Sequence, residues 1–109
     1  MPPLDQFQKF DIRVGTVISA RPHRGARNPA LQLQIDFGEM GVKQSSAQIT
    51  RRYTSEDLIS RQVVAVVNFP PRRIAGFRSD VLVLGAIQPG GDVVLLTPDG
   101  NVPAGTRIG

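Results

Sequence analysis

Two consecutive prolines, Pro70 and Pro71, stand between two strongly apolar segments of this chain and limit what the region can fold into. Each proline fixes its own φ angle and lacks a backbone N–H donor, so neither a helix interior nor a central strand fits here. The flanking segments 62–68 and 80–87 are dense in Val, Leu and Ile, which is typical of strands buried on both faces. The sequence therefore predicts two buried strands joined by a stiff loop.

The stiff loop combines cationic and apolar side chains. A solvent-facing loop has little use for this mixture unless it touches a partner, so we expect a binding loop. The alternative, for each apolar residue taken singly, is that its side chain folds back into the core. The residues concerned are Phe69, Arg72, Arg73, Ile74, Phe77 and Arg78.

The rest of the chain is predicted to form short strands between turns. Segment 31–37 alternates strictly, with Leu, Leu, Ile and Phe on one face and Gln, Gln and Asp on the other, as in a half-buried antiparallel strand. Thr54, followed three positions later by Asp57, predicts the start of a short helix that ends near residue 59. Further strands are expected over 12–18, 42–49 and 92–97.

Five or more short strands, with one small helix between the third and the fourth, favour a closed or partly closed β-barrel over a β-α-β sheet. The OB-fold, a five-stranded Greek-key β-barrel, has this order of elements. We therefore expect an all-β fold of this class, with short helices, as a single domain over residues 1–109.

The N-terminal segment 1–10 carries Leu4, Phe7 and Phe10 at three-residue spacing, which would line one side of a short helix. So brief a helix is not stable alone, so its apolar edge must lie on its own barrel or on another subunit. The two choices predict a monomer and a dimer respectively.

Composition argues against catalysis. The chain has no cysteine and a single histidine, and its acidic residues are scattered singly, so we expect no enzyme, metal or cofactor. His23 lies in an arginine-rich loop, where an exposed position is expected rather than a catalytic one. With no apolar run long enough to span a bilayer and no signal peptide, the chain reads as cytoplasmic. The net charge of +4 favours an anionic or electronegative partner.

Two classes of ligand fit the same surface. A nucleic acid would contact arginines and lysines through its phosphates and stack its bases on Phe69, Phe77 or Tyr53. A peptide would use an apolar hollow lined by Phe69, Ile74 and Phe77, with hydrogen bonds from the polar segment 43–48. For Ser45, Ser46 and Gln48 in that segment, the alternative is a merely solvated strand face.

Three stretches, 11–15, 43–50 and 68–79, resemble the EMAP-type tRNA-binding domain, and most closely its bacterial export-related chaperone members. The resemblance spans essentially the whole chain. It implies an OB-fold homodimer with the N-terminal segment and the C-terminal strands at the subunit interface. It also implies a cytoplasmic chaperone that binds unfolded or pre-secretory polypeptides, with a link to the export machinery.

The chain departs from the tRNA-binding pattern in the proline-rich loop. Pro70 and Ala75 replace basic positions, Arg78 stands where an acidic residue is usual, and Leu82 replaces a methionine. The loss of two cations lowers the affinity for a phosphate backbone. This favours a peptide as the ligand and leaves tRNA binding as the alternative. The expected peptide- or tRNA-binding residues are Arg13, Lys43, Ser45, Ser46, Gln48, Asn68, Phe69, Arg72, Arg73, Ile74, Phe77, Arg78 and Ser79.

Overall fold

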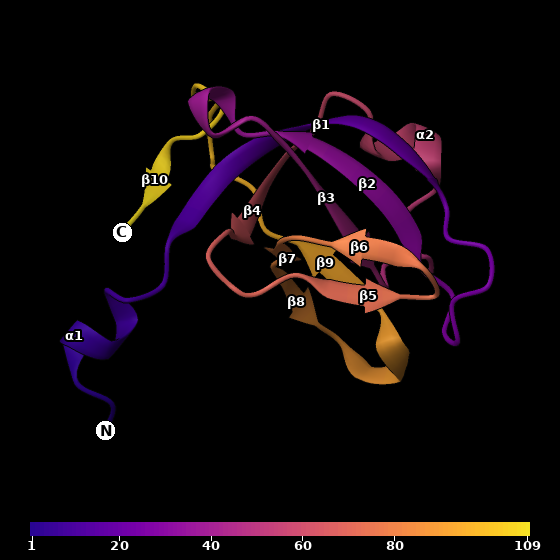
Figure 1. Cartoon of the computed structure of the whole chain (residues 1–109), viewed down its shortest axis with the longest axis horizontal. Helices are drawn as coiled ribbons and strands as arrows, with labels where there is room; N and C mark the ends of the chain where they lie inside the picture. The colour runs from indigo at the N-terminus through magenta and orange to yellow at the C-terminus, as the bar shows by residue number, and fades with distance from the viewer.

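A computed structural model describes all residues, 1–109, as a small, strongly curved β-sheet with short helices at its margins (Figure 1). The main sheet has the strand order β3-β2-β1-β4-β7, and β10 pairs with the start of β1. The elements are α1 (Leu4–Phe7), β1 (Ile12–Pro22), β2 (Leu31–Asp36), η1 (Gly38–Met40), β3 (Val42–Ala47), α2 (Ser55–Leu58), β4 (Gln62–Val66), β5 (Arg72–Ile74), β6 (Phe77–Ser79), β7 (Leu82–Val83), β8 (Gly85–Ile87), η2 (Pro89–Gly91), β9 (Val93–Leu95) and β10 (Arg107–Ile108).

The long strand β1 organises the barrel because it pairs antiparallel with β2, β4 and β10. Its register against β2 shifts between Val17 and Ser19, and such bulges increase the local twist and bend a sheet. The bend brings β3 close to the residues that precede β7. There the Asp80 N–H donates to the Gln44 carbonyl at 2.8 Å, and the Ser45 hydroxyl donates to the Val81 carbonyl at 3.0 Å. The sheet is thus nearly closed, which confirms the predicted barrel.

The core fills the inside of this barrel. Leu33, Ile35 and Phe37, the predicted apolar face of the alternating segment, are all fully buried. They pack in one cluster with side chains from β1, β4 and α2. A second, smaller cluster lies on the other face of β1 and β4 and contains Ile12, Val14, Val64 and Val66. Strand β4 is therefore buried on both faces, as predicted.

The prediction of a strand buried on both faces is wrong for segment 80–87. Leu82 and Ile87 are exposed, and the segment breaks into the two short strands β7 and β8. Strand β8 leaves the barrel and pairs only with β9. The apolar composition of segment 80–87 therefore does not mean that its side chains are buried in this chain.

The predicted stiff loop contains a β-hairpin, formed by β5 and β6 after Pro70 and Pro71. Its two-residue turn, Ala75-Gly76, has positive φ at both positions, 49° and 80°. That backbone matches the right-handed twist of the flanking strands and keeps the hairpin tight. The short helix after residue 54 also forms as predicted, since Thr54 and Asp57 make a reciprocal capping box at the start of α2.

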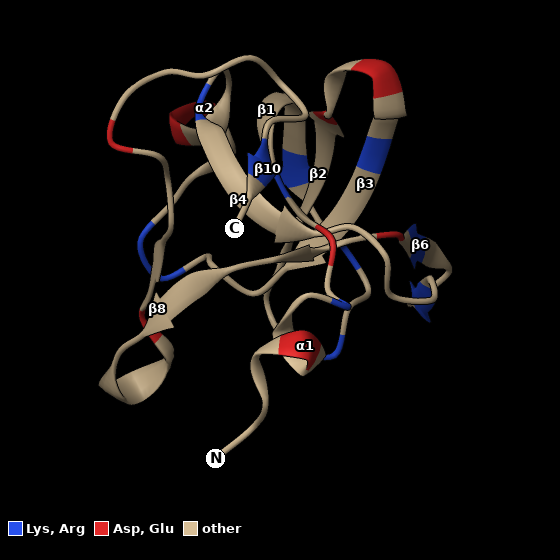
Figure 2. Cartoon of the chain, turned by 90° about the vertical axis from the view of Figure 1, so that its left-hand side faces the viewer, with Lys and Arg blue, Asp and Glu red and all other residues tan.

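The N-terminal segment stands apart from the barrel. All ten of its residues are exposed, and α1 buries none of its side chains. Figure 2 shows α1 and the β8–β9 hairpin extending from the barrel toward the same side. No helix of the chain is long and apolar enough to cross a membrane.

Candidate functional site

The β5–β6 hairpin lies beside the outer face of β1, β2 and β3 and forms one wall of a shallow groove there. One hollow of the groove, of about 130 Å³, is lined by Ser19, Arg21, Gln32, Gln34 and Phe77. A second hollow, of about 390 Å³, shares Gln34 with the first. We call the two together the polar groove, and its remaining lining residues are Val42, Lys43, Gln44, Arg78 and Asp80.

Strand β3 holds the hairpin through side chains rather than through a backbone ladder. The Gln44 side-chain amide donates to the Arg78 carbonyl at 3.0 Å, and the Ser46 N–H donates to the Ser79 hydroxyl oxygen at 3.0 Å. Ser79, predicted to bind a ligand, is therefore engaged in anchoring the hairpin. Two side-chain contacts fix the width of the groove at this end.

Ser45 does not lie on the groove surface, contrary to the expectation that it contacts a ligand. Its side chain is fully buried, and its hydroxyl bonds the Val81 carbonyl. In the period-two pattern of β3, Ser45 shares the inward face with Ala47, and Lys43 lies on the same face at the half-buried start of the strand. Gln48 lies beyond the end of β3 and is exposed, and it does not line the polar groove.

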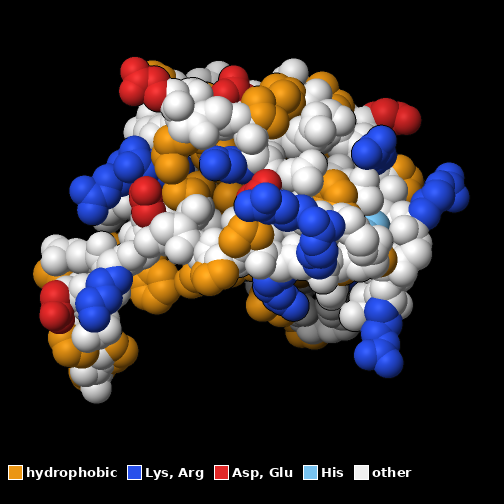
Figure 3. Space-filling view, viewed as in Figure 1, with side chains coloured by type: hydrophobic (Ala, Val, Ile, Leu, Met, Phe, Trp, Pro, Cys, Tyr) orange, Lys and Arg blue, Asp and Glu red, His pale blue; other side chains and the backbone are white.

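Charge in the groove is partly compensated. The Arg78 Nε atom lies 2.8 Å from Asp80 Oδ1, whereas the Arg21 Nε donates to the neutral Gln32 Oε1 at 2.9 Å and keeps its positive charge uncompensated. Lys43 has no acidic partner within ion-pair distance. Figure 3 shows basic side chains gathered over the part of the face that β5 and β6 occupy, and hydrophobic ones toward the N-terminal segment.

Arg72 and Arg73 lie on β5 and are exposed to solvent. The only hydrogen bond that either guanidinium makes is a long one, from Arg73 Nη1 to the Gly76 carbonyl at 3.4 Å. Ile74 is half-buried and pairs with Phe77 across the hairpin. The hairpin therefore offers two cations that are free to meet an anionic ligand.

Arg13, Asn68 and Phe69 belong to a different part of the molecule and do not line the polar groove. Arg13 bonds Asp11 Oδ1 at 2.6 Å, and Asn68 binds the backbone of residues 9 and 11. The Phe69 ring meets Phe10 edge to face, with 5.7 Å between centroids. Asn68 and Phe69 therefore tether the end of the N-terminal segment to the barrel, and Arg13 holds Asp11, the residue that follows it.

His23 is buried, which corrects the expectation of an exposed loop position. Its side chain is 5% exposed, its Nδ1 lies 2.8 Å from Ser46 Oγ, and its ring packs on Phe77 at 5.3 Å between centroids. Phe77 therefore packs on His23, whereas Phe69 packs on Phe10. The single apolar hollow predicted from Phe69, Ile74 and Phe77 does not form, because the two phenylalanine rings lie in different places.

Sequence reasoning missed most of the groove residues, among them Arg21, Gln32 and Gln34. The signal for the two glutamines was present, because they form the polar face of the alternating segment 31–37. Arg21 carried no such signal. Its place in the groove depends on the length of β1, which continues to Pro22 rather than ending near residue 18.

The nearly closed β-barrel with a basic hairpin on one face places the chain among OB-fold domains, and comparison with known proteins shows its family. The family model "Putative tRNA binding domain" matches residues 12–107, and the chain belongs to this family.

Within the family, the chain is similar over its whole length to two CsaA chaperones of known structure. The CsaA of Bacillus anthracis is 58% identical, with a TM-score of 0.96, and the match covers 100% of this chain and 99% of that one. The CsaA of Picrophilus torridus is 49% identical, with a TM-score of 0.93 and full coverage of both chains. The predicted resemblance to the export-related chaperone members is confirmed.

The chain is also similar to part of longer proteins. It is 44% identical over 106 residues to a methionine–tRNA ligase of Methanothrix thermoacetophila. That match covers 97% of this chain and 15% of the ligase. The chain thus spans a small fraction of the curated relatives that it matches.

Proposed function

We propose that this protein is a non-catalytic, homodimeric chaperone that binds extended segments of unfolded or pre-secretory polypeptides in the polar groove. The full-length similarity to two CsaA chaperones supports this role, since the match leaves almost no part of either relative uncovered. The ligases, by contrast, match only through a minor segment.

The chemistry of the polar groove carries the proposal. Gln32 and Gln34 present carboxamides, which both donate and accept hydrogen bonds, on the same face of β2. An extended polypeptide backbone offers N–H donors and carbonyl acceptors alternately, whereas a phosphate offers acceptors alone. Arg78 is already paired with Asp80, which reduces the positive charge available to phosphates. The groove therefore matches a polypeptide better than a nucleic acid backbone.

Dimerisation would cover the apolar surface on the N-terminal side. Leu4, Phe7 and Phe10 are exposed there and, with Ile108, line a hollow of about 280 Å³. Ile87, on the hairpin that extends toward the same side, is 83% exposed. Monomeric proteins rarely expose large apolar patches to water. We propose that a second copy of the chain covers this surface, so that the assembly carries two grooves and gains avidity for long clients.

tRNA binding is the second candidate function, favoured by the family model and by the exposed Arg72 and Arg73. Both arginines lie on one edge of the hairpin, where phosphates of a folded RNA have access to them. Such contacts release counterions and lose affinity steeply as salt rises. A polypeptide held mainly by neutral carboxamides and an aromatic ring depends on salt much less.

A Gln34→Leu variant separates the two functions. The change keeps the size and the charge of the side chain close to the original and removes both hydrogen-bonding groups from the centre of the groove. We expect binding of a labelled, reduced and alkylated polypeptide to weaken about fivefold, with tRNA binding unchanged. The exposed loop change Asn101→Leu is the matched control. Unchanged polypeptide binding by Gln34→Leu would contradict the proposed site.

A further inference from the structure

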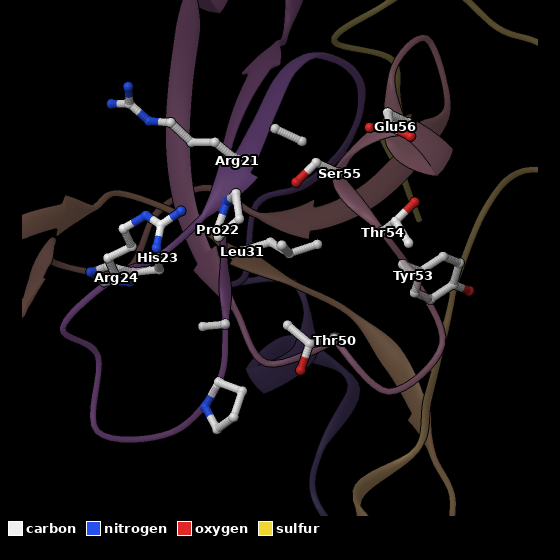
Figure 4. A pocket seen from close by; sticks show the side chains of 13 residues that line it. Arg21, Pro22, His23, Arg24, Leu31, Thr50, Tyr53, Thr54, Ser55 and Glu56 are labelled. Carbon is white, nitrogen blue, oxygen red and sulfur yellow. The ribbon is translucent and has the colours of Figure 1, made fainter.

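A larger cleft lies at the end of the barrel, where the β1–β2 connection approaches residues 50–56 (Figure 4). Its volume is about 670 Å³, and Leu31 and the Tyr53 ring give it apolar walls. Charged side chains of opposite sign face it from its two sides. We call it the end cleft, and its characteristic residues are Arg21, His23 and Arg24 on one side and Thr50, Tyr53 and Glu56 on the other.

The end cleft adjoins the polar groove. Arg21 lines both, because it sits on β1 at the point where the groove ends. His23 connects the same two sites: it lines the end cleft, and its ring packs on Phe77, which lines the groove. An extended chain that leaves the groove past Arg21 therefore reaches the end cleft directly.

His23 carries the one buried side-chain nitrogen or oxygen of the protein that has no hydrogen-bond partner, its Nε2. The other ring nitrogen, Nδ1, is engaged with Ser46. Buried polar atoms are almost always hydrogen-bonded in native proteins, and an unpaired one is costly. The unpaired nitrogen belongs to a residue that lines the cleft, and because it has almost no exposed surface, a ligand in the cleft reaches it only when the ring or its neighbours shift.

We propose that the end cleft is a second subsite for the same polypeptide, and that it takes an apolar side chain of the client beside an acidic one. This inference rests on the proposed function. The apolar side chain meets Leu31 and Tyr53, and the acidic one meets Arg24, which has no partner in the free protein. The client's backbone or an adjacent polar group bonds His23 Nε2. The client segment is thus an extended stretch in which an acidic residue neighbours a large apolar residue.

The composition of the chain provides two reporters for this subsite. The protein has one tyrosine, one histidine and no tryptophan, and both single residues line the end cleft. Tyr53 does not line the polar groove, so its fluorescence distinguishes a ligand in the cleft from one in the groove. The probe is a short synthetic peptide rich in Glu-Leu pairs and free of aromatic residues and histidine. Its control replaces each Leu by Ser.

We expect the Glu-Leu peptide to change Tyr53 emission and to shift the ¹⁵N resonance of His23 Nε2, and the Ser peptide to do neither. A Thr50→Trp variant places a bulky ring at the mouth of the cleft, and we expect it to bind the Glu-Leu peptide about tenfold more weakly. Glu39→Trp is the control, because η1 follows the opposite end of β2.

Two failures are distinguishable. If the wild-type protein binds the Glu-Leu peptide, loses that binding in Gln34→Leu, and shows no response at Tyr53 and no effect of Thr50→Trp, the end cleft is not a subsite although the groove binds polypeptide. If the wild-type protein binds neither this peptide nor an unfolded polypeptide, the proposed function fails and the inference fails with it.

Discussion

The Asn68 side-chain oxygen accepts a hydrogen bond from the Asp11 N–H at 2.9 Å. The same carboxamide donates through Nδ2 to the Lys9 carbonyl at 2.8 Å. One side chain after the end of β4 therefore holds the backbone of the N-terminal segment at two points. Because α1 makes no buried contact, this anchor and the Phe10–Phe69 pair set the direction in which the segment leaves the barrel.

Asn68→Ala should release the N-terminal segment. Removing two hydrogen bonds from a solvent-accessible position lowers the free energy of unfolding by about 1 kcal/mol. The direct measurement is amide exchange at Asp11, which we expect to become much faster than in the wild type. Asn101→Ala, in an exposed loop, is the control. Equal protection of the Asp11 N–H in the variant and the wild type would show that the anchor is not energetically significant.

The hairpin turn should tolerate Asn better than its native Ala75. Ala75 has a φ of 49°, a conformation that disfavours residues with a Cβ other than Asn and Asp. Asn-Gly is the preferred pair in a two-residue turn of this type, so Ala75→Asn should raise the unfolding free energy by about 0.5–1 kcal/mol. Ala75→Val should lower it. Denaturant titration of the three proteins checks the order, and a Val variant as stable as the Asn variant would contradict the account.

Gly15 is required because the core closes over it. A Cβ at this position would overlap Ile35 Cγ2 and lie 2.7 Å from Phe37 Cε1, both in the packed barrel interior. Overpacking of this kind costs about 1–3 kcal/mol, so Gly15→Ala should destabilise the protein by that amount. Gly100→Ala is the matched control, because its added Cβ meets nothing within 4 Å. Thermal unfolding compares the two, and equal melting temperatures would show that the core relaxes freely.

Two exposed carboxylates should make stability fall in acid. The hydrogen bond from Arg52 lowers the pKa of Asp92, and hydrogen bonding to the Thr54 backbone N–H, then to its side chain, lowers that of Asp57. A carboxyl whose pKa is lower in the folded state stabilises the protein above its unfolded pKa of about 4. This contribution is lost as the pH falls through the folded-state pKa.

The Asp92→Asn variant should therefore be less stable than the wild type at neutral pH, and the difference should shrink as the pH falls through the folded-state pKa of Asp92. Denaturant midpoints measured across this range provide the comparison. A difference that persists unchanged in acid would mean that Asp92 contributes through packing rather than through its charge.

Much of the fold followed from local pattern. The strict alternation of 31–37 predicted β2 and its buried face, and the Thr54–Asp57 pair predicted α2, because both signals act within one element. Burial of His23 could not be predicted, since it depends on Ser46 and Phe77, which are distant in sequence. Exposure of Leu82 and Ile87 was missed for a related reason: apolar composition alone does not distinguish a residue of the barrel interior from one on the surface.

The candidate site, like the fold, could be predicted only in part from the sequence. Composition singled out the arginines of β5 and Lys43 at the start of β3, which the structure leaves without acidic partners. It did not reveal the anchoring roles of Asn68 and Ser79, because anchoring and ligand-binding side chains have the same chemistry. Ala75 gave no turn signal, as its residue type does not favour a positive φ. Only the folded arrangement separates the groove from the anchor of the N-terminal segment.

The most direct test of the central claim is fluorescence anisotropy with a labelled unfolded polypeptide and with bulk tRNA, each at about 50 and 200 mM salt. We predict that the polypeptide binds with similar affinity at both, whereas tRNA binds weakly at low salt and loses its affinity at high salt. Tight binding of tRNA with no uptake of unfolded polypeptide would contradict the account, and the groove and hairpin would then form a phosphate-contacting surface.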